Sequence, residues 1–188
     1  NDRLQSRGGI VSLSGSGYYN HVQQFEKVYA YATAGGQDIA ALYDSPGDDT
    51  LLATSSRASL SGGGSFTEVQ RFDRVYAYAT AGGLDVARLY DSPGNDTLTA
   101  SGSKATLSGS GFYNAAQQFE RVYAYATSGG SDTARFYDSA GNDAFEASRF
   151  QASLRGSGFS NEAQQFERVY AYATRGGWDT ATYYYTPG

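Results

Sequence analysis

The sequence of 188 residues contains no cysteine and no methionine, and it has only three prolines, one histidine and one tryptophan. Without cysteine, the chain can form neither a disulfide framework nor a thiolate metal site. No apolar run approaches the roughly 20 residues that a membrane-spanning helix needs. The 14 basic residues are scattered among 19 acidic ones, and the formal net charge is −5. We therefore expect neither a membrane span nor a nucleic-acid partner.

What the sequence does contain is an internal repeat. The phrase "VYAYAT" begins at Val28, Val75, Val122 and Val169, always 47 residues apart. The flanking "GGxD" element keeps the same phase throughout, and "DS(P/A)G" does so in the first three repeats, which gives four units, 1–47, 48–94, 95–141 and 142–188. A period of 20–50 residues is typical of solenoids, propellers and other arrays, whose units stack on one another. We predict a single repeat domain.

Each unit reads as a series of short strands. In the second unit and the start of the third, alternating segments at 75–80, 86–92, 96–101 and 105–111 are separated by glycine, proline and asparagine turn signals. These predict four strands per unit. The segment that follows, 112–121 ("FYNAAQQFER"), is the one stretch with helical or loop character.

The strand faces favour one architecture over another. Alternate positions carry small apolar residues (28, 30 and 32; 40 and 42; 51 and 53; 58 and 60), and the positions between them are mostly polar. One buried and one wet face fits a β-solenoid, whereas the blades of a propeller bury both faces of their inner strands. We predict an all-β solenoid of about eight coils, two per unit, about 38 Å long; the alternative is a four-bladed β-propeller.

The tyrosines of the repeated phrase should point outward, because the valine and alanines between them point inward. They would form two aromatic columns along the stack, made of Tyr29 and Tyr31, Tyr76 and Tyr78, Tyr123 and Tyr125, and Tyr170 and Tyr172. One interpretation is a ladder of aromatic pairs that stabilises neighbouring coils. The other is a binding surface, either for sugar rings or for another chain.

Aspartates recur at the turns of every unit. Carboxylates and turn carbonyls are the hard oxygen ligands that calcium prefers. The candidate ligands are Asp38, Asp44, Asp49, Asp85, Asp91, Asp96, Asp132, Asp138 and Asp143. The alternative is ordinary turn chemistry, in which aspartate accepts hydrogen bonds from turn amides and glycine supplies positive φ. No other cofactor is indicated.

Two resemblances follow from these motifs. "GGxD" and "GNDTL" distantly resemble pieces of the RTX, or haemolysin-type, calcium-binding repeat, although that repeat has nine residues and these elements recur once per 47. The whole chain is similar to tandem arrays with the pattern F-x-x-V-x-A-Y-A-T-x-G-G-x-D in very large secreted or surface proteins of bacteria. That similarity implies an extracellular setting and carries no biochemical activity with it.

No residue set predicts catalysis. His21 is the only histidine, and the other units have different residues in its place, so a surface histidine is expected. A glycosidase would need a pair of carboxylates, but Glu26, Asp73, Glu120 and Glu167 recur in every unit, as scaffold residues do. We therefore do not expect an enzyme.

The function that the sequence favours is an extracellular structural repeat segment, a stalk, fibre or adhesin spacer. Neither end carries an obvious capping repeat, so we expect that copies could associate end to end into filaments. Two alternatives stay open: a carbohydrate-binding module that uses the tyrosine columns on a polysaccharide, and a calcium-dependent folding module.

Overall fold

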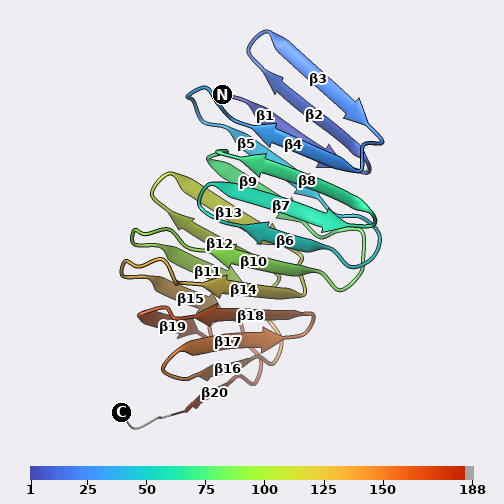
Figure 1. The fold of residues 1–188 in the computed structure, drawn as a ribbon. Helices are drawn as coiled ribbons and strands as arrows, with labels where there is room; N and C mark the ends of the chain where they lie inside the picture. The colour runs from blue at the N-terminus through green and yellow to red at the C-terminus, as the bar shows by residue number, and fades with distance from the viewer. Residues whose placement is uncertain (185–188) are drawn as a thin grey trace.

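The computed structural model describes residues 1–184, and this part of the chain is built entirely from β-strands and turns. Twenty strands form two sheets of ten strands, which face each other along a single stack (Figure 1). The N-terminus and the described C-terminal end lie at opposite ends of the stack. Within residues 1–184, no helix is long and apolar enough to cross a membrane.

Strands from all four units contribute to both sheets. In spatial order, the first sheet contains β19 (Arg168–Tyr172), β15 (Thr133–Tyr137), β11 (Thr97–Ser101), β12 (Lys104–Gly109), β13 (Phe112–Gln117), β9 (Arg74–Tyr78), β5 (Ile39–Tyr43), β1 (Arg3–Arg7), β2 (Ile10–Gly15) and β3 (Tyr18–Gln23). The second contains β20 (Thr180–Tyr183), β16 (Ala144–Ala147), β17 (Gln151–Gly156), β18 (Phe159–Gln164), β14 (Arg121–Tyr125), β10 (Val86–Tyr90), β6 (Thr50–Ala53), β7 (Arg57–Gly62), β8 (Ser65–Gln70) and β4 (Lys27–Tyr31).

Each unit has five strands: a three-stranded antiparallel meander and two single strands. In the second unit, β6, β7 and β8 form a meander in the second sheet; β9 then lies in the first sheet and β10 in the second. The next meander, β11 to β13, lies in the first sheet. Because the chain crosses between the sheets three times from one meander to the next, successive meanders occupy alternate sheets.

The predicted β-solenoid is confirmed, and the propeller alternative is not, because the units do not form separate sheets around an axis. The predicted coil length is wrong. Parallel pairing joins Arg3 to Ile39, Ile39 to Arg74 and Arg74 to Tyr113, which are steps of 36, 35 and 39 residues instead of 23–24. The chain thus makes about five turns, not eight coils. The hairpins within each meander add strands to a sheet without adding a turn.

The stretch expected to be helical or loop, 112–121, is largely a strand. Residues Phe112 to Gln117 form β13, which pairs with β12 on one side and β9 on the other. Phe112, Asn114 and Ala116 are buried on its inward face. The composition of this segment is compatible with a helix, but pairing on both edges satisfies its backbone hydrogen bonds in the sheet, so the tertiary context decides its structure.

The core lies between the two sheets and consists mainly of alanine, leucine, valine and phenylalanine. The predicted inward positions are buried, as Ala40, Leu42, Leu51 and Ala58 illustrate. Burial of a leucine side chain contributes about 1.5–3 kcal/mol relative to exposure. A sheet of ten strands at the usual spacing of about 4.8 Å spans about 43 Å along the stack.

Candidate functional site

The aspartates predicted as ligands are all buried, at the turns where the chain passes from one sheet to the other. Their exposed fractions are 7% or less. The turn between β5 and β6 leads from the first sheet to the second and carries Asp44 and Asp49. The turn between β10 and β11 leads back and carries Asp91 and Asp96. The corresponding aspartates of successive units therefore lie at opposite edges of the stack.

The first role of these carboxylates is to join one turn to the next along the stack. The backbone N–H of Asp49 donates to Asp85 Oδ1 at 2.7 Å, and the N–H of Asp85 donates to Glu120 Oε2 at 2.8 Å. The same ladder runs from Asp96 through Asp132 to Glu167. Hydrogen bonds from N–H to carboxylate are about twice as strong as neutral ones, so the ladder ties adjacent turns together.

The ladder also accounts for Asp38. It accepts from the N–H of Asp2 at 2.6 Å, and its own N–H donates to Asp73 Oδ2 at 2.7 Å. The structure therefore separates Asp38 from Asp44 and Asp49, the other two candidate ligands in the first unit and the start of the second. The sequence did not predict that Asp73, Glu120 and Glu167 accept hydrogen bonds in the ladder. Their fourfold recurrence was a signal, but only the stacking register shows which amides they face.

A second set of hydrogen bonds holds each turn closed. Asp49 accepts from the N–H and the hydroxyl of Ser45, within the same turn, at 3.0–3.1 Å. Asp44 instead links two turns, because it accepts from the N–H of Ala81, in the turn between β9 and β10, at 2.7 Å. Asp96 with Ser92, and Asp143 with Ser139, repeat the first of these arrangements. This is the turn chemistry that the sequence offered as the alternative to calcium.

Three of these carboxylates nevertheless converge. One oxygen from each of Asp44, Asp49 and Asp85 lies within 4.8 Å of the others. Burial raises the pKa of Asp85 to about 6, and the charges of Glu120, Asp44 and Asp49 add to this rise. Burial likewise raises the pKa of Asp49 and Asp132.

The corresponding aspartates of the next units make related contacts. The N–H of Asp96 donates to Asp132 Oδ1, and Asp91 Oδ1 is buried without a hydrogen-bond partner. Asp138 and Asp143 lie beside Asp179. At Asp138, burial raises the pKa, but hydrogen bonds from the N–H groups of Arg175 and Thr174 outweigh burial and leave the pKa lowered.

The tyrosines of the repeated phrase do not form two continuous columns, so that prediction is wrong. Their strands, β4, β9, β14 and β19, alternate between the second and the first sheet, and the tyrosines therefore alternate between the two outer faces. The reason is the odd number of crossings per unit. Tyr29, Tyr31, Tyr170 and Tyr172 are exposed, while the inner copies, Tyr76, Tyr78, Tyr123 and Tyr125, are half-buried.

What the tyrosines form instead is a series of stacked pairs. Tyr78 stacks on Tyr43 with a centroid distance of 4.7 Å and an interplanar angle of 14°. The pairs Tyr90–Tyr125 (4.9 Å) and Tyr137–Tyr172 (5.0 Å) repeat this geometry. Each pair joins strands that are neighbours in the stack, which fits the stabilising interpretation; binding of sugar rings remains a prediction.

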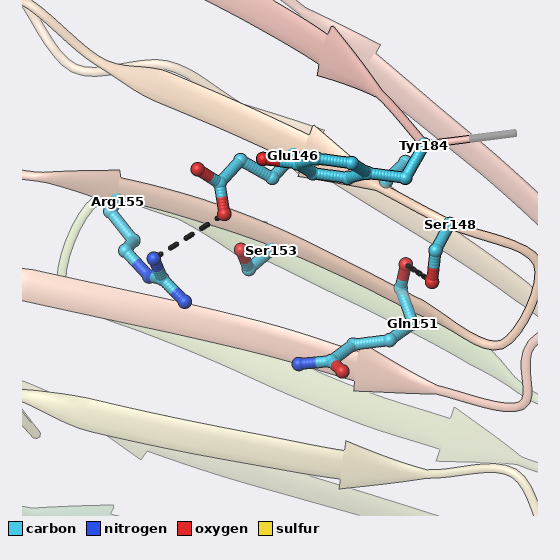
Figure 2. Close-up of a pocket in the computed structure, with 7 residues that line it drawn as sticks. Glu146, Ser148, Gln151, Ser153, Arg155 and Tyr184 are labelled. Carbon is cyan, nitrogen blue, oxygen red and sulfur yellow. Dashed lines mark hydrogen bonds and ion pairs between the residues drawn. The ribbon is translucent and has the colours of Figure 1, made fainter.

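One depression lies near the C-terminal end of the stack. It lies on the outer face at β16 and β17, has a volume of about 110 Å³, and is lined by Glu146, Ser148, Gln151, Ser153, Arg155 and Tyr184 (Figure 2). Arg155 Nη1 lies 3.5 Å from Glu146 Oε2, and both side chains are well exposed. A single carboxylate paired with an exposed arginine is not the two-carboxylate arrangement of a glycosidase. His21 is also exposed, as expected.

The recurring features are thus buried turn aspartates joined by hydrogen bonds and stacked pairs of tyrosines, which repeat along the stack. Comparison of the chain with protein-family models, curated proteins and solved structures found no match.

Proposed function

We propose that the chain is a structural repeat segment, a stalk, fibre or spacer in an extracellular protein. The observation that carries the proposal is the fourfold recurrence of one turn-to-turn hydrogen bond, from the N–H of Asp2, Asp49, Asp96 and Asp143 to a carboxylate oxygen of Asp38, Asp85, Asp132 and Asp179. Each inner turn is tied to the next by an N–H to carboxylate bond, as at Asp49 and Asp85 or Asp96 and Asp132. A catalytic or binding site is usually singular, whereas a scaffold needs the same link at every level.

The direction of the bonds supports the same role. In a solenoid, the hydrogen bonds between strands run along the stack, and the aspartate ladder and the tyrosine pairs run the same way. A pull along the stack is therefore shared by two ten-stranded sheets and by the side-chain links at both edges. The extracellular setting rests on the resemblance to secreted and surface arrays.

Two measurements test this role. Antibodies raised against the chain should label intact cells that produce it, before any permeabilisation; labelling only after permeabilisation would rule out the extracellular setting. Small-angle scattering of the dilute monomer should give an elongated, rigid particle. A compact or flexible scattering curve would remove the spacer function.

A second candidate function, a calcium-dependent folding module, is favoured by the cluster of Asp44, Asp49 and Asp85. Three buried carboxylates within reach of one ion repel each other without it. In the next unit, the buried Asp91 Oδ1 lacks a partner that a cation would supply. A ligand that binds only the folded state at 100 times its Kd stabilises it by about 2.7 kcal/mol.

Thermal melts with calcium and with chelator test this candidate. We expect calcium to raise the melting temperature by several degrees, and Asp44→Asn with Asp91→Asn to abolish the increase. Asp48→Asn is the matched control: Asp48 Oδ1 accepts from Leu84 N–H, and Asn95 and Asn142 already make the same bond in later units. Identical melts with and without calcium would leave the turn network as purely internal hydrogen bonding.

A further inference from the structure

The two ends of the stack expose strand edges. The first sheet ends at β3 and β19, and the second ends at β4 and β20 (Figure 1). An edge strand presents unpaired N–H and C=O groups, which are a template for another strand. All residues of β3, β19 and β20 are exposed. Each end therefore offers two strands, one from each sheet.

Apolar side chains at these ends are exposed although their copies are buried. Phe25 is 61% exposed, whereas its copy Phe119 is 0% exposed. Val169, at the other end, is 37% exposed, whereas Val122 is 1% exposed. The residues next to Phe25 and Val169 in the sequence are nearly the same as those next to their copies, so the difference in exposure comes mainly from what lies beside them in the stack. Within residues 1–184, the strands at both ends therefore lack the neighbour that the inner strands have.

The inner units show which neighbour fits. Inside the stack, β9 pairs with β13 and β10 pairs with β14. At the C-terminal end, β19 and β20 of the fourth unit correspond to β9 and β10 of the second. At the N-terminal end, β3 and β4 of the first unit correspond to β13 and β14 of the third. The edges of β19 and β20 at the C-terminal end are therefore equivalent to the edges that pair with β13 and β14 inside the stack, and β3 and β4 are the strands equivalent to β13 and β14.

We infer that a second copy of this chain docks head to tail, with its β3 on β19 and its β4 on β20. Successive units exchange their sheets, and the chain has four units. The first sheet of one copy therefore continues into the first sheet of the next copy, and the second sheet into the second. The inner register, Ala77 opposite Ala116, places Ala171 opposite Val22 of the second copy, both inward. Likewise Tyr76 opposite Ala115 places Tyr170 opposite His21 of the second copy.

Side chains at the two ends also complement each other. In the three stacked pairs, Tyr43, Tyr90 and Tyr137 stack on Tyr78, Tyr125 and Tyr172. The copies without such a pair in residues 1–184 are Tyr184 (56% exposed) and Tyr31 (55% exposed), which lie at opposite ends. The same register brings Tyr184 onto Tyr31 of the second copy and completes a fourth pair.

The turn ladder ends in the same complementary way. The N–H of Asp85 donates to Glu120, and the N–H of Asp132 donates to Glu167. By the same register, the N–H of Asp179 faces Glu26 of the second copy, and Glu26 is exposed in the single chain. Strand pairing, the tyrosine pair and the carboxylate ladder therefore all indicate one orientation and one register.

This inference rests on the proposed scaffold function and names its partner, so the test must separate the two. Val22→Lys places a charge on the N-terminal edge alone, and Ala171→Lys places one on the C-terminal edge alone. Sedimentation of the unmodified chain should show mass rising with concentration from the 20.1 kDa monomer. Each variant alone should stay monomeric, and an equimolar mixture should form dimers and nothing larger, because one intact end of each kind remains.

Disulfide trapping tests the register independently of those variants. The chain has no cysteine, so His21→Cys mixed with Tyr170→Cys should give a disulfide-linked heterodimer under mild oxidation. His21→Cys mixed with Tyr172→Cys is the control, since these positions are offset by two residues and lie beyond the reach of a disulfide.

Head-to-tail docking is overturned if the unmodified chain stays monomeric at millimolar concentration, or if Val22→Lys still assembles. The proposed register is also overturned if His21→Cys cross-links with Tyr172→Cys to the same extent as with Tyr170→Cys. If the chain is rigid and found on the cell surface but does not assemble, the scaffold function is retained and only the docking is excluded. A chain that assembles but is found only inside the cell would instead remove the extracellular function and keep the interface.

Discussion

At the residue scale, four positions adopt an unusual backbone conformation. Gln24, Arg71, Gln118 and Gln165, one in each unit, have φ between 60° and 64°. Each follows the last strand of a meander and turns the chain toward the other sheet. A side chain makes this left-handed conformation unfavourable by about 1 kcal/mol.

We predict that Gln118→Gly stabilises the fold by up to about 1 kcal/mol, because it relieves this strain and loses only part of the gain to unfolded-state entropy. Gln117→Gly, one residue earlier in β13, should destabilise it by a similar amount. Chemical denaturation of both variants measures the difference. Equal loss of stability in both would show that Gln118 is not strained.

The buried carboxylates predict how stability depends on pH. The pKa of Asp85 is about 6 in the folded state against an ordinary value of 3.8. Between these values the folded state binds a proton that the unfolded state does not. The free energy of unfolding should therefore fall as pH rises from about 4 to about 6, by up to about 3 kcal/mol for this residue.

The matched variant is Asp85→Asn, measured by denaturation across this pH range in chelator. It cannot titrate, and its side-chain oxygen can still accept from Asp49 N–H. We expect a flatter pH dependence than in the unmodified chain, which retains contributions of the same sign from Asp49 and Asp132. An unchanged slope would mean that Asp85 is ionised throughout.

At the element scale, turns stack as closely as strands do. A Cβ atom built on Gly130 would collide with the carbonyl of Gly94 in the neighbouring turn, and φ at Gly130 is +109°. Gly129, beside it, also has a positive φ of +97°, but a Cβ there would meet nothing within 4 Å. Substitution of Gly129 therefore tests backbone strain alone, whereas substitution of Gly130 tests backbone strain together with the close contact to the neighbouring turn.

We predict that Gly129→Ala destabilises the chain by about 1–2 kcal/mol through backbone strain alone. Gly130→Ala should cost at least twice as much, since it also pushes the two turns apart. Thermal unfolding of the two variants gives the comparison. If their melting temperatures fall equally, the turns are not in contact as described.

The sequence predicted the solenoid and its inward residues because small apolar side chains alternate along each strand. Positions such as Ala40 and Leu51 could be assigned to the core from this period alone. The coil length could not be predicted, because Val28 and Leu51 look equivalent but belong to a single strand, β4, and a meander strand, β6. Nothing local distinguishes a hairpin from a crossing between sheets.

The same limit applies to the site. Burial of the nine aspartates follows from tertiary stacking, which brings the turn at 44–49 against Asp85. The sequence offered calcium binding and turn hydrogen bonding as alternatives, and the structure shows the second in detail. The prediction of tyrosine columns was wrong because of the topology. Each unit crosses between the sheets three times, so consecutive copies of the tyrosine strand lie in opposite sheets.

At the scale of the whole molecule, position in the stack decides what a residue contributes. Phe25 and Phe119 occupy the same place in their units, but Phe119 is enclosed and Phe25 lies at the open end. In a repeat array, stability is approximately a sum of units and of the interfaces between neighbours. A residue at an open end therefore lacks half of its interface.

We predict that Phe119→Ala costs about 3–5 kcal/mol, as expected for a buried phenylalanine, while Phe25→Ala changes the stability of the monomer by less than about 0.5 kcal/mol. Denaturation at low concentration measures both. At high concentration the two should differ in a second way: Phe25→Ala should weaken assembly, because docking would bury Phe25 as Phe119 is buried now. Equal costs in the dilute monomer would contradict a stack whose N-terminal end is open.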